Sequence, residues 1–174
     1  ETGHDFTGCK VVITGGGSGT GASMARHFAA SGAHIIIAGR RKSALEAVAE
    51  GCSTIYPFVC DVTQETAVVD LFDFAKGKGV PQAAADIVIA NAGIAASAPL
   101  DKTDRSLWDQ IIAVNLTGPF LTLREGLVRM KAANCQQGRL IAIASMTAKR
   151  AYPYISAYAA SKHGVLGLVK SAAL

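Results

Sequence analysis

Short, strongly apolar runs alternate along this chain with longer segments of helical periodicity, and this alternation limits the fold more than any other feature. Several runs are rich in β-branched residues, which is typical of strands buried on both faces of a parallel sheet. Because parallel neighbours need a crossover, usually a helix, the alternation predicts βαβ units with right-handed connections. The expected strands are Val11–Thr14, Ala33–Ala38, Thr54–Cys60, Asp86–Ala90 and Arg139–Ala144.

The segments between these runs are expected to be helices. Two of them begin after residues that favour helix starts, Asp61–Glu65 and Thr103-Asp104. No linker, repeat or low-complexity segment interrupts the pattern, so we predict one α/β domain over residues 1–174. The expected helices are Thr20–Ser31, Ser43–Glu50, Thr63–Lys76, a long one over Thr103–Lys131, and a last one from about Ile155.

Composition narrows the possible functions. The net charge is +4, but the 17 basic residues are dispersed and aromatics make up only 6%, so a nucleic-acid partner is not expected. No apolar run reaches the roughly 18 residues of a membrane helix, so no membrane partner is expected. The polar N-terminus does not show the charged-then-apolar pattern of a signal sequence. The cysteines form no CxxC pair, so we expect no metal site, and free thiols favour the cytoplasm. They are Cys9, Cys52, Cys60 and Cys135.

A glycine-rich turn, TGGGSGTG at residues 14–21, follows the first strand and leads into the first helix. Residues without Cβ atoms let the backbone approach a pyrophosphate, and the helix N-terminus offers N–H groups to it. The spacing TGxxxGxG fits fully, whereas GxGxxG/A fits only in relaxed form. A flexible turn without a ligand is the alternative, which the position between strand and helix disfavours. The expected phosphate-binding residues are Gly15, Gly17, Ser18, Gly19, Thr20 and Gly21.

The end of the second strand bears on which dinucleotide binds. About 20 residues after the glycines, a carboxylate would accept a hydrogen bond from the ribose 2′-hydroxyl of NAD. Here Gly39 is followed by Arg40 and Arg41, and arginine instead pairs with a 2′-phosphate. We therefore expect a preference for NADP(H), with NAD(H) as the alternative. The arginines could also simply solvate the start of the next helix.

Tyr158 and Lys162 are four residues apart in the last expected helix, so they share a face. A free phenol has a pKa near 10, and a nearby ammonium favours the phenolate, which suits the tyrosine to proton transfer at neutral pH. Ser145 ends the fifth strand, where ligands bind in parallel sheets. Asn91-Ala92-Gly93 ends the fourth, and Asn115 lies in mid-helix, where asparagine is unusual unless it has a functional contact or is incidental.

Together these motifs resemble the short-chain dehydrogenase/reductase family, in its TGxxxGxG branch, over nearly the whole chain. The resemblance implies a Rossmann-type, doubly wound parallel sheet with helices on both faces. It implies that Tyr158 is the general acid/base, that Lys162 lowers its pKa and binds the nicotinamide ribose, and that Ser145 polarises the substrate carbonyl. Asn115 would hold a water of a proton relay. Further cofactor contacts would be Asp61, Val62, Asn91, Ala92 and Gly93.

The activity expected from this resemblance is NADP(H)-dependent hydride transfer to or from a small-molecule carbonyl or alcohol. A non-catalytic nucleotide-binding or interaction protein on the same fold is the alternative. We also expect a homodimer or homotetramer, because the helix around Asn115 is apolar on more than one side. Members of the family continue beyond the tyrosine helix, whereas this sequence ends at Leu174, so the family fold is expected to be truncated there.

Overall fold

A single parallel sheet with the strand order β3-β2-β1-β4-β5 organises the computed structural model, which describes residues 5–81, 83–150 and 152–174. All five expected strands are confirmed, with ends that shift by one or two residues. Residues 1–4, which belong to the segment read as lacking a signal sequence, lie outside the described residues. The strands are β1 (Lys10–Thr14), β2 (His34–Gly39), β3 (Ile55–Val59), β4 (Ile87–Ala90) and β5 (Arg139–Ala142).

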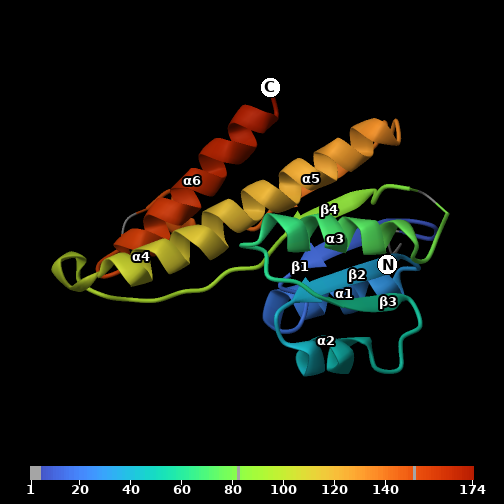
Figure 1. Cartoon of the computed structure of the whole chain (residues 1–174), viewed down its shortest axis with the longest axis horizontal. Coiled ribbons are helices and arrows are strands. Elements are labelled where there is room, and N and C mark those ends of the chain that lie inside the picture. Colours follow the sequence, from blue (N-terminus) through green and yellow to red (C-terminus); the bar gives the residue numbers. More distant parts are fainter. Residues whose placement is uncertain (1–4, 82, 151) are drawn as a thin grey trace.

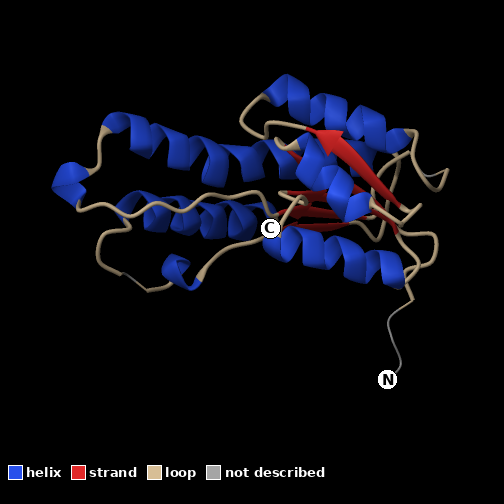
Figure 2. Cartoon of the chain, turned by 90° about the horizontal axis from the view of Figure 1, so that it is seen from below, coloured by secondary structure: helices blue, strands red, loops and turns tan. Residues whose placement is uncertain are grey.

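Side chains along β1 alternate between two buried clusters, one on each face of the sheet. Val11 and Ile13 pack with α1 (Gly19–Ala30) and α2 (Lys42–Ala49). Val12, between them, packs with α3 (Glu65–Lys76) and α5 (Gly118–Ala132). Since complete burial of such a side chain contributes about 1.5–3 kcal/mol, both faces add to stability. Figure 2 shows helices on both sides of the strands, as expected for a doubly wound sheet.

The long helix expected over Thr103–Lys131 is present, but it is not regular. It consists of α4 (Arg105–Ile112), a π-helical turn at Ala113–Thr117, and α5. Asp104 caps its start, because Oδ1 accepts a 2.7 Å hydrogen bond from the backbone N–H of Leu107. The two helices on either side of the π-turn have different partners: α4 packs against α6 (Ser156–Ala172), while α5 packs against α3 and the sheet.

These contacts within one chain cover much of the apolar surface that the sequence shows on several sides of the long helix. Figure 1 shows α4 and α6, coloured yellow and red, reaching out beyond the sheet, while α5, in orange, runs from α4 back alongside β4. Arg105–Ala132 is also long and apolar enough, with a mean hydropathy of 1.2, to meet the criterion for a membrane span. The core helix of a globular domain meets the same criterion, so this is weak evidence for a membrane.

The start of α3 lies two residues later than expected. Asp61 does not begin the helix; instead its Oδ1 accepts hydrogen bonds from the N–H and the hydroxyl of Thr63, at 3.0 and 2.8 Å. This closes a tight Asx turn ahead of Glu65. The turn keeps Asp61 and Val62 at the carboxyl end of β3, beside the other strand ends.

The two edges of the sheet differ in sequence. β3 contains Pro57, which is compatible with an edge because a proline has no N–H to offer a further strand. β5 lies at the other edge of the described sheet, and its Ile141 side chain is 40% exposed. The loops that follow β4 and β5 meet at one point, where Ala98 pairs with Ile155.

Candidate active site

The glycine-rich turn lies at the carboxyl end of β1, where the strand order reverses between β1 and β4. Gly15 has a φ of +68°, and an added Cβ would lie 2.8 Å from Cα of Ala92, so glycine is required there. A Cβ at Gly21 would lie 2.2 Å from the carbonyl oxygen of Gly15. Gly19, in contrast, has a φ of +52° and open space around it. The turn is thus packed inward and open outward, which suits an anion at the N-terminus of α1.

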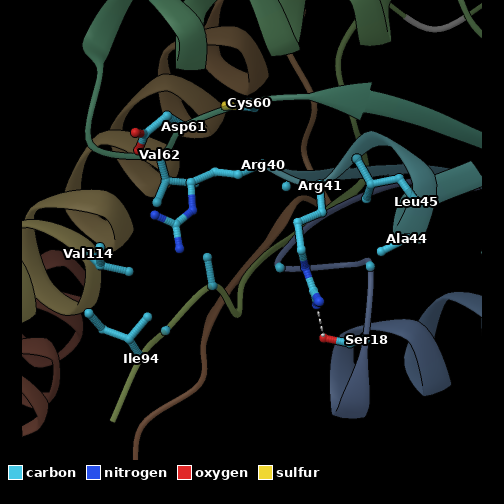
Figure 3. Close-up of a pocket in the computed structure, with 15 residues that line it drawn as sticks. Ser18, Arg40, Arg41, Ala44, Leu45, Cys60, Asp61, Val62, Ile94 and Val114 are labelled. Atoms are coloured by element: carbon cyan, nitrogen blue, oxygen red, sulfur yellow. Dashed lines mark hydrogen bonds between the residues drawn. The ribbon is translucent and has the colours of Figure 1, made fainter. Parts of the chain in front are cut away.

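A pocket of about 390 Å³ opens beside this turn (Figure 3). It extends over the ends of β1, β2, β3 and β4, which is the usual ligand position in sheets of this kind. Gly39, Ala44, Leu45, Cys60, Ile94 and Val114 contribute to its walls. Most of the expected cofactor-binding residues come together here: Gly15, Gly17, Ser18, Arg40, Arg41, Asp61, Val62, Ala92 and Gly93.

The two arginines after β2 differ in orientation. Arg41 donates a 3.3 Å hydrogen bond from its guanidinium to Oγ of Ser18. Figure 3 shows Arg41 reaching toward this serine, while Arg40 extends toward the side of the pocket formed by Val62 and Val114. Ser18 is the N-cap residue of α1, yet its hydroxyl makes no capping bond. Two guanidinium groups and Ser18, the N-cap residue of α1, therefore border one pocket, which favours an anionic ligand.

Six of the expected cofactor-binding residues do not line this pocket: Gly19, Thr20, Gly21, Asn91, Tyr158 and Lys162. Gly19 and Thr20 form the exposed first turn of α1. The amide of Asn91 donates hydrogen bonds to the carbonyls of Thr14 and Gly15, at 3.0 and 3.3 Å. Its backbone N–H also donates to Oγ1 of Thr14, at 3.1 Å. Asn91 thus fixes the end of β4 to the glycine-rich turn, and its contact with a ribose stays a prediction.

Lys162 is the buried charge of the site. Its side chain is 5% exposed, and Nζ donates a 2.9 Å hydrogen bond to the carbonyl of Ile143, just after β5. Burial lowers the pKa of Lys162, because the charged form is less well solvated. Nζ lies 5.7 Å from the centre of the Tyr158 ring, so the two side chains share one face of α6, as expected.

Ser145 lies between β5 and a short 3₁₀ turn at Met146–Ala148. Its Oγ accepts a 3.2 Å hydrogen bond from the N–H of Thr147 and keeps capacity to donate. Among the described residues, two buried side-chain oxygens lack a hydrogen-bond partner, Oγ1 of Thr147 and Oγ of Ser156. Both lie in the segment that joins Ser145 to Tyr158.

Asn115 is completely buried in the π-turn. Its Oδ1 accepts a hydrogen bond from the N–H of Ile94, and its Nδ2 donates one to the carbonyl of Ile94, both at 2.8 Å. Nδ2 also lies 3.4 Å from Oγ of Ser161. The family resemblance implied that Asn115 holds a water; the described bonds are to protein atoms, two of them to the backbone of Ile94, and the water stays a prediction.

Gly93 connects the pocket with the buried lysine. It lines the pocket, and a Cβ added to it would lie 3.7 Å from Nζ of Lys162 and 3.5 Å from Oδ1 of Asn115. A ligand that enters the pocket along Gly93 therefore comes close to Lys162. No group of three or more His, Cys, Asp and Glu side chains within the described ranges is arranged to hold a metal ion.

Sequence reasoning missed the contributions of Ile94, Ile143 and Ser161. The first two act on the site through backbone atoms, which every residue type possesses, so no motif could have identified them. Ser161 was not among the expected site residues. Its hydroxyl was the available signal, because a buried hydroxyl is expected to have hydrogen-bond partners.

Comparison with known proteins gives a consistent result. Residues 10–174 match the family model described as short chain dehydrogenase. The chain is 35% identical over 170 residues to a D-beta-hydroxybutyrate dehydrogenase of Rhizobium meliloti, covering 94% of this chain and 64% of that protein. It is 33% identical over 177 residues to 3beta-hydroxysteroid dehydrogenase 1 of Eggerthella lenta, covering 98% of this chain and 66% of the relative.

A solved structure is similarly related. The short-chain type dehydrogenase/reductase from Mycobacterium marinum superposes with a TM-score of 0.89 at 30% identity, covering 97% of this chain and 67% of that one. The chain thus spans just under two thirds of the length of the curated relatives described above.

Proposed function

Because the chain belongs to the short chain dehydrogenase family, we propose that it takes part in NADP(H)-dependent interconversion of a carbonyl and an alcohol. The observation that carries the proposal is the position of Gly93, which lines the pocket of about 390 Å³ and also adjoins Lys162 beside Tyr158. The glycine-rich turn and the two arginines fit a dinucleotide with an additional phosphate. When bound, NADP(H) supplies or accepts the hydride.

The residues of this chain would then transfer the proton and bind the substrate oxygen. Tyr158 gives its phenolic proton to the developing alkoxide, or takes one from the alcohol in the reverse direction. The buried ammonium of Lys162, held by the carbonyl of Ile143, stabilises negative charge on that tyrosine. Ser145 donates a hydrogen bond to the substrate oxygen, since its bond with Thr147 uses it only as an acceptor.

The preference for NADP(H) over NAD(H) is supported by the absence of a side chain at Gly39 and by the arginines that follow it. Both arginines line the pocket, together with Gly39. Arg41 is already aligned with Ser18 at the N-terminus of α1, so a 2′-phosphate bound there would meet two positive features.

A panel of carbonyls and alcohols, followed by NADPH and NADH absorbance, tests the proposed reaction. The panel starts with 3-hydroxybutyrate and 3β-hydroxysteroids, which the names of the relatives suggest. Turnover that depends on the cofactor supports an enzyme. Tight cofactor binding without turnover of any compound would support instead a non-catalytic nucleotide-binding protein on this fold.

We also propose that the protein forms a homodimer or homotetramer in the cytoplasm. Exposed large apolar side chains on α4 and α5 support an interface. They are Trp108, Phe120, Leu127 and Val128, with exposures from 37 to 52%. The free cysteines fit a reducing compartment. A light-scattering mass of a single chain at micromolar concentration would contradict the oligomer.

A further inference from the structure

Ser161 lies immediately before Lys162 in α6, and its side chain is completely buried. Its hydroxyl donates a 2.7 Å hydrogen bond to the backbone carbonyl of Tyr158. The same oxygen accepts a 3.4 Å hydrogen bond from Nδ2 of Asn115, which is 46 positions earlier in the chain. One hydroxyl therefore links the backbone at the tyrosine to the side chain in the π-turn.

The contacts with Ile94 give the Asn115 amide a single orientation. Oδ1 must accept, because it faces the N–H of Ile94, and Nδ2 must donate, because it faces the carbonyl of the same residue. A flipped amide would oppose donor to donor and acceptor to acceptor. In the observed orientation Nδ2 has a second hydrogen, and Ser161 is the acceptor for it. Three segments meet here: the loop after β4, the π-turn and α6.

We propose that Ser161 is a positioning residue for the reaction proposed above, on which this inference rests. It acts by holding the Tyr158 end of α6 at a fixed distance from Asn115 and from the loop that carries Gly93. Catalysis is sensitive to such alignment, because a displacement of about 1 Å at the reacting groups can cost a hundredfold in rate. The effect passes through Tyr158 and Asn115, so Ser161 itself need not touch substrate or cofactor.

A purely local role for Ser161 is the competing explanation. A helical serine often bonds a carbonyl one turn earlier, and an alanine then serves nearly as well. Two observations favour positioning. The hydroxyl is shared between two elements, and its removal leaves an N–H of a completely buried amide without an acceptor. Such a group is costly in a low-dielectric interior, so the amide is expected to shift.

The test compares Ser161→Ala with Ser171→Ala, a matched change at an exposed position near the end of the same helix. We expect Ser161→Ala to lower kcat about tenfold while the KM for NADPH stays unchanged, since the pocket is built mainly on β1, β2 and their following turns. Hydrogen–deuterium exchange at the amide of Ile94 should become faster, because its acceptor on Asn115 loses its anchor. Ser171→Ala should change none of these.

Each outcome is informative. An unchanged kcat in an active protein overturns the proposal, as does a loss of kcat accompanied by an equal loss of NADPH affinity and faster exchange throughout α6. If the parent protein shows no turnover with any substrate, the proposed function fails. The exchange measurement still decides whether Ser161 holds Asn115 in its contact with Ile94. Faster exchange confined to Ile94 and the π-turn supports it, and unchanged exchange at Ile94 refutes it.

Discussion

Replacing Gly39 by aspartate should reverse the preference between the two nicotinamide cofactors. The substitution puts a carboxylate at the end of β2, in the wall of the pocket beside Arg40. An added Cβ would lie 3.6 Å from Cδ2 of Leu45, which is an ordinary contact, and Gly39 is outside the left-handed region. The variant should therefore fold as the parent does.

The magnitude follows from the hydrogen bond that the new carboxylate gains. A bond that involves a charged group contributes about 1.5–3 kcal/mol, and about 1.4 kcal/mol corresponds to a factor of ten in affinity. The ratio of NADH to NADPH affinity should thus rise by about 10-fold to 150-fold from this attraction. Repulsion between the carboxylate and the 2′-phosphate adds to the change in the same direction.

The assay is isothermal titration calorimetry with each cofactor, and Gly39→Asn is the control because it has the same size without the charge. Arg40→Ala gives the complementary test and should weaken NADPH binding by about tenfold or more while affecting NADH less. If aspartate and asparagine change the ratio of NADH to NADPH affinity equally, the carboxylate does not bind the ribose 2′-hydroxyl. An equal loss of both cofactors in Arg40→Ala would refute the 2′-phosphate contact.

Three further predictions concern the site and its supports. Tyr158→Phe should abolish turnover but preserve cofactor affinity by calorimetry, because only the proton-bearing hydroxyl is removed; retained turnover would contradict its role. Thr147→Val should raise the free energy of unfolding by about 1 kcal/mol by removing an unpaired buried hydroxyl, whereas Thr14→Val should lower it by about 1–3 kcal/mol, because two N–H groups lose their acceptor. If denaturant unfolding shows that both substitutions change the free energy of unfolding in the same direction, this reasoning is refuted. Burial raises the pKa of the Cys60 thiol to about 11, while a hydrogen bond from Thr54 lowers the pKa of Cys52. Iodoacetamide near neutral pH should therefore modify Cys52 before Cys60, which peptide mass mapping checks, and equal modification rates of these two thiols would contradict the prediction.

The sheet and the glycine-rich turn were predictable because their causes are local. Buried parallel strands require continuous apolar runs, and the turn requires glycine where Gly15 approaches Ala92 and Gly21 approaches Gly15. The π-turn was not predictable in the same way. It lies around Asn115, whose hydrogen bonds go to Ile94, 21 residues away, and local propensity contains no information about that contact.

The helix start at Asp61 shows a different limit. Aspartate favours both helix N-caps and Asx turns, since in each case its carboxylate accepts from a nearby backbone N–H. The structure has the second arrangement, with Thr63 as the donor. For the candidate site, the glycine-rich turn, the two arginines and Ala92-Gly93 were identified from their positions after strands, and Asp61 and Val62 from the family resemblance. The side chains of Leu45, Ile94 and Val114, which also line the pocket, were not identified. What remained hidden were bonds made by backbone carbonyls, such as that of Ile143 to Lys162.

The unequal edges of the sheet make strand addition one-sided. Pro57 withholds a donor from the outer side of β3, so a foreign strand would meet an interrupted ladder there. β5 has no proline, and within the described residues its outer backbone groups have no neighbouring strand. A further strand, whether of this protein or of another chain, can therefore be added beside Leu140 and Ile141 but not beside β3. A proline introduced into β5 would give this edge the protection that the other already has.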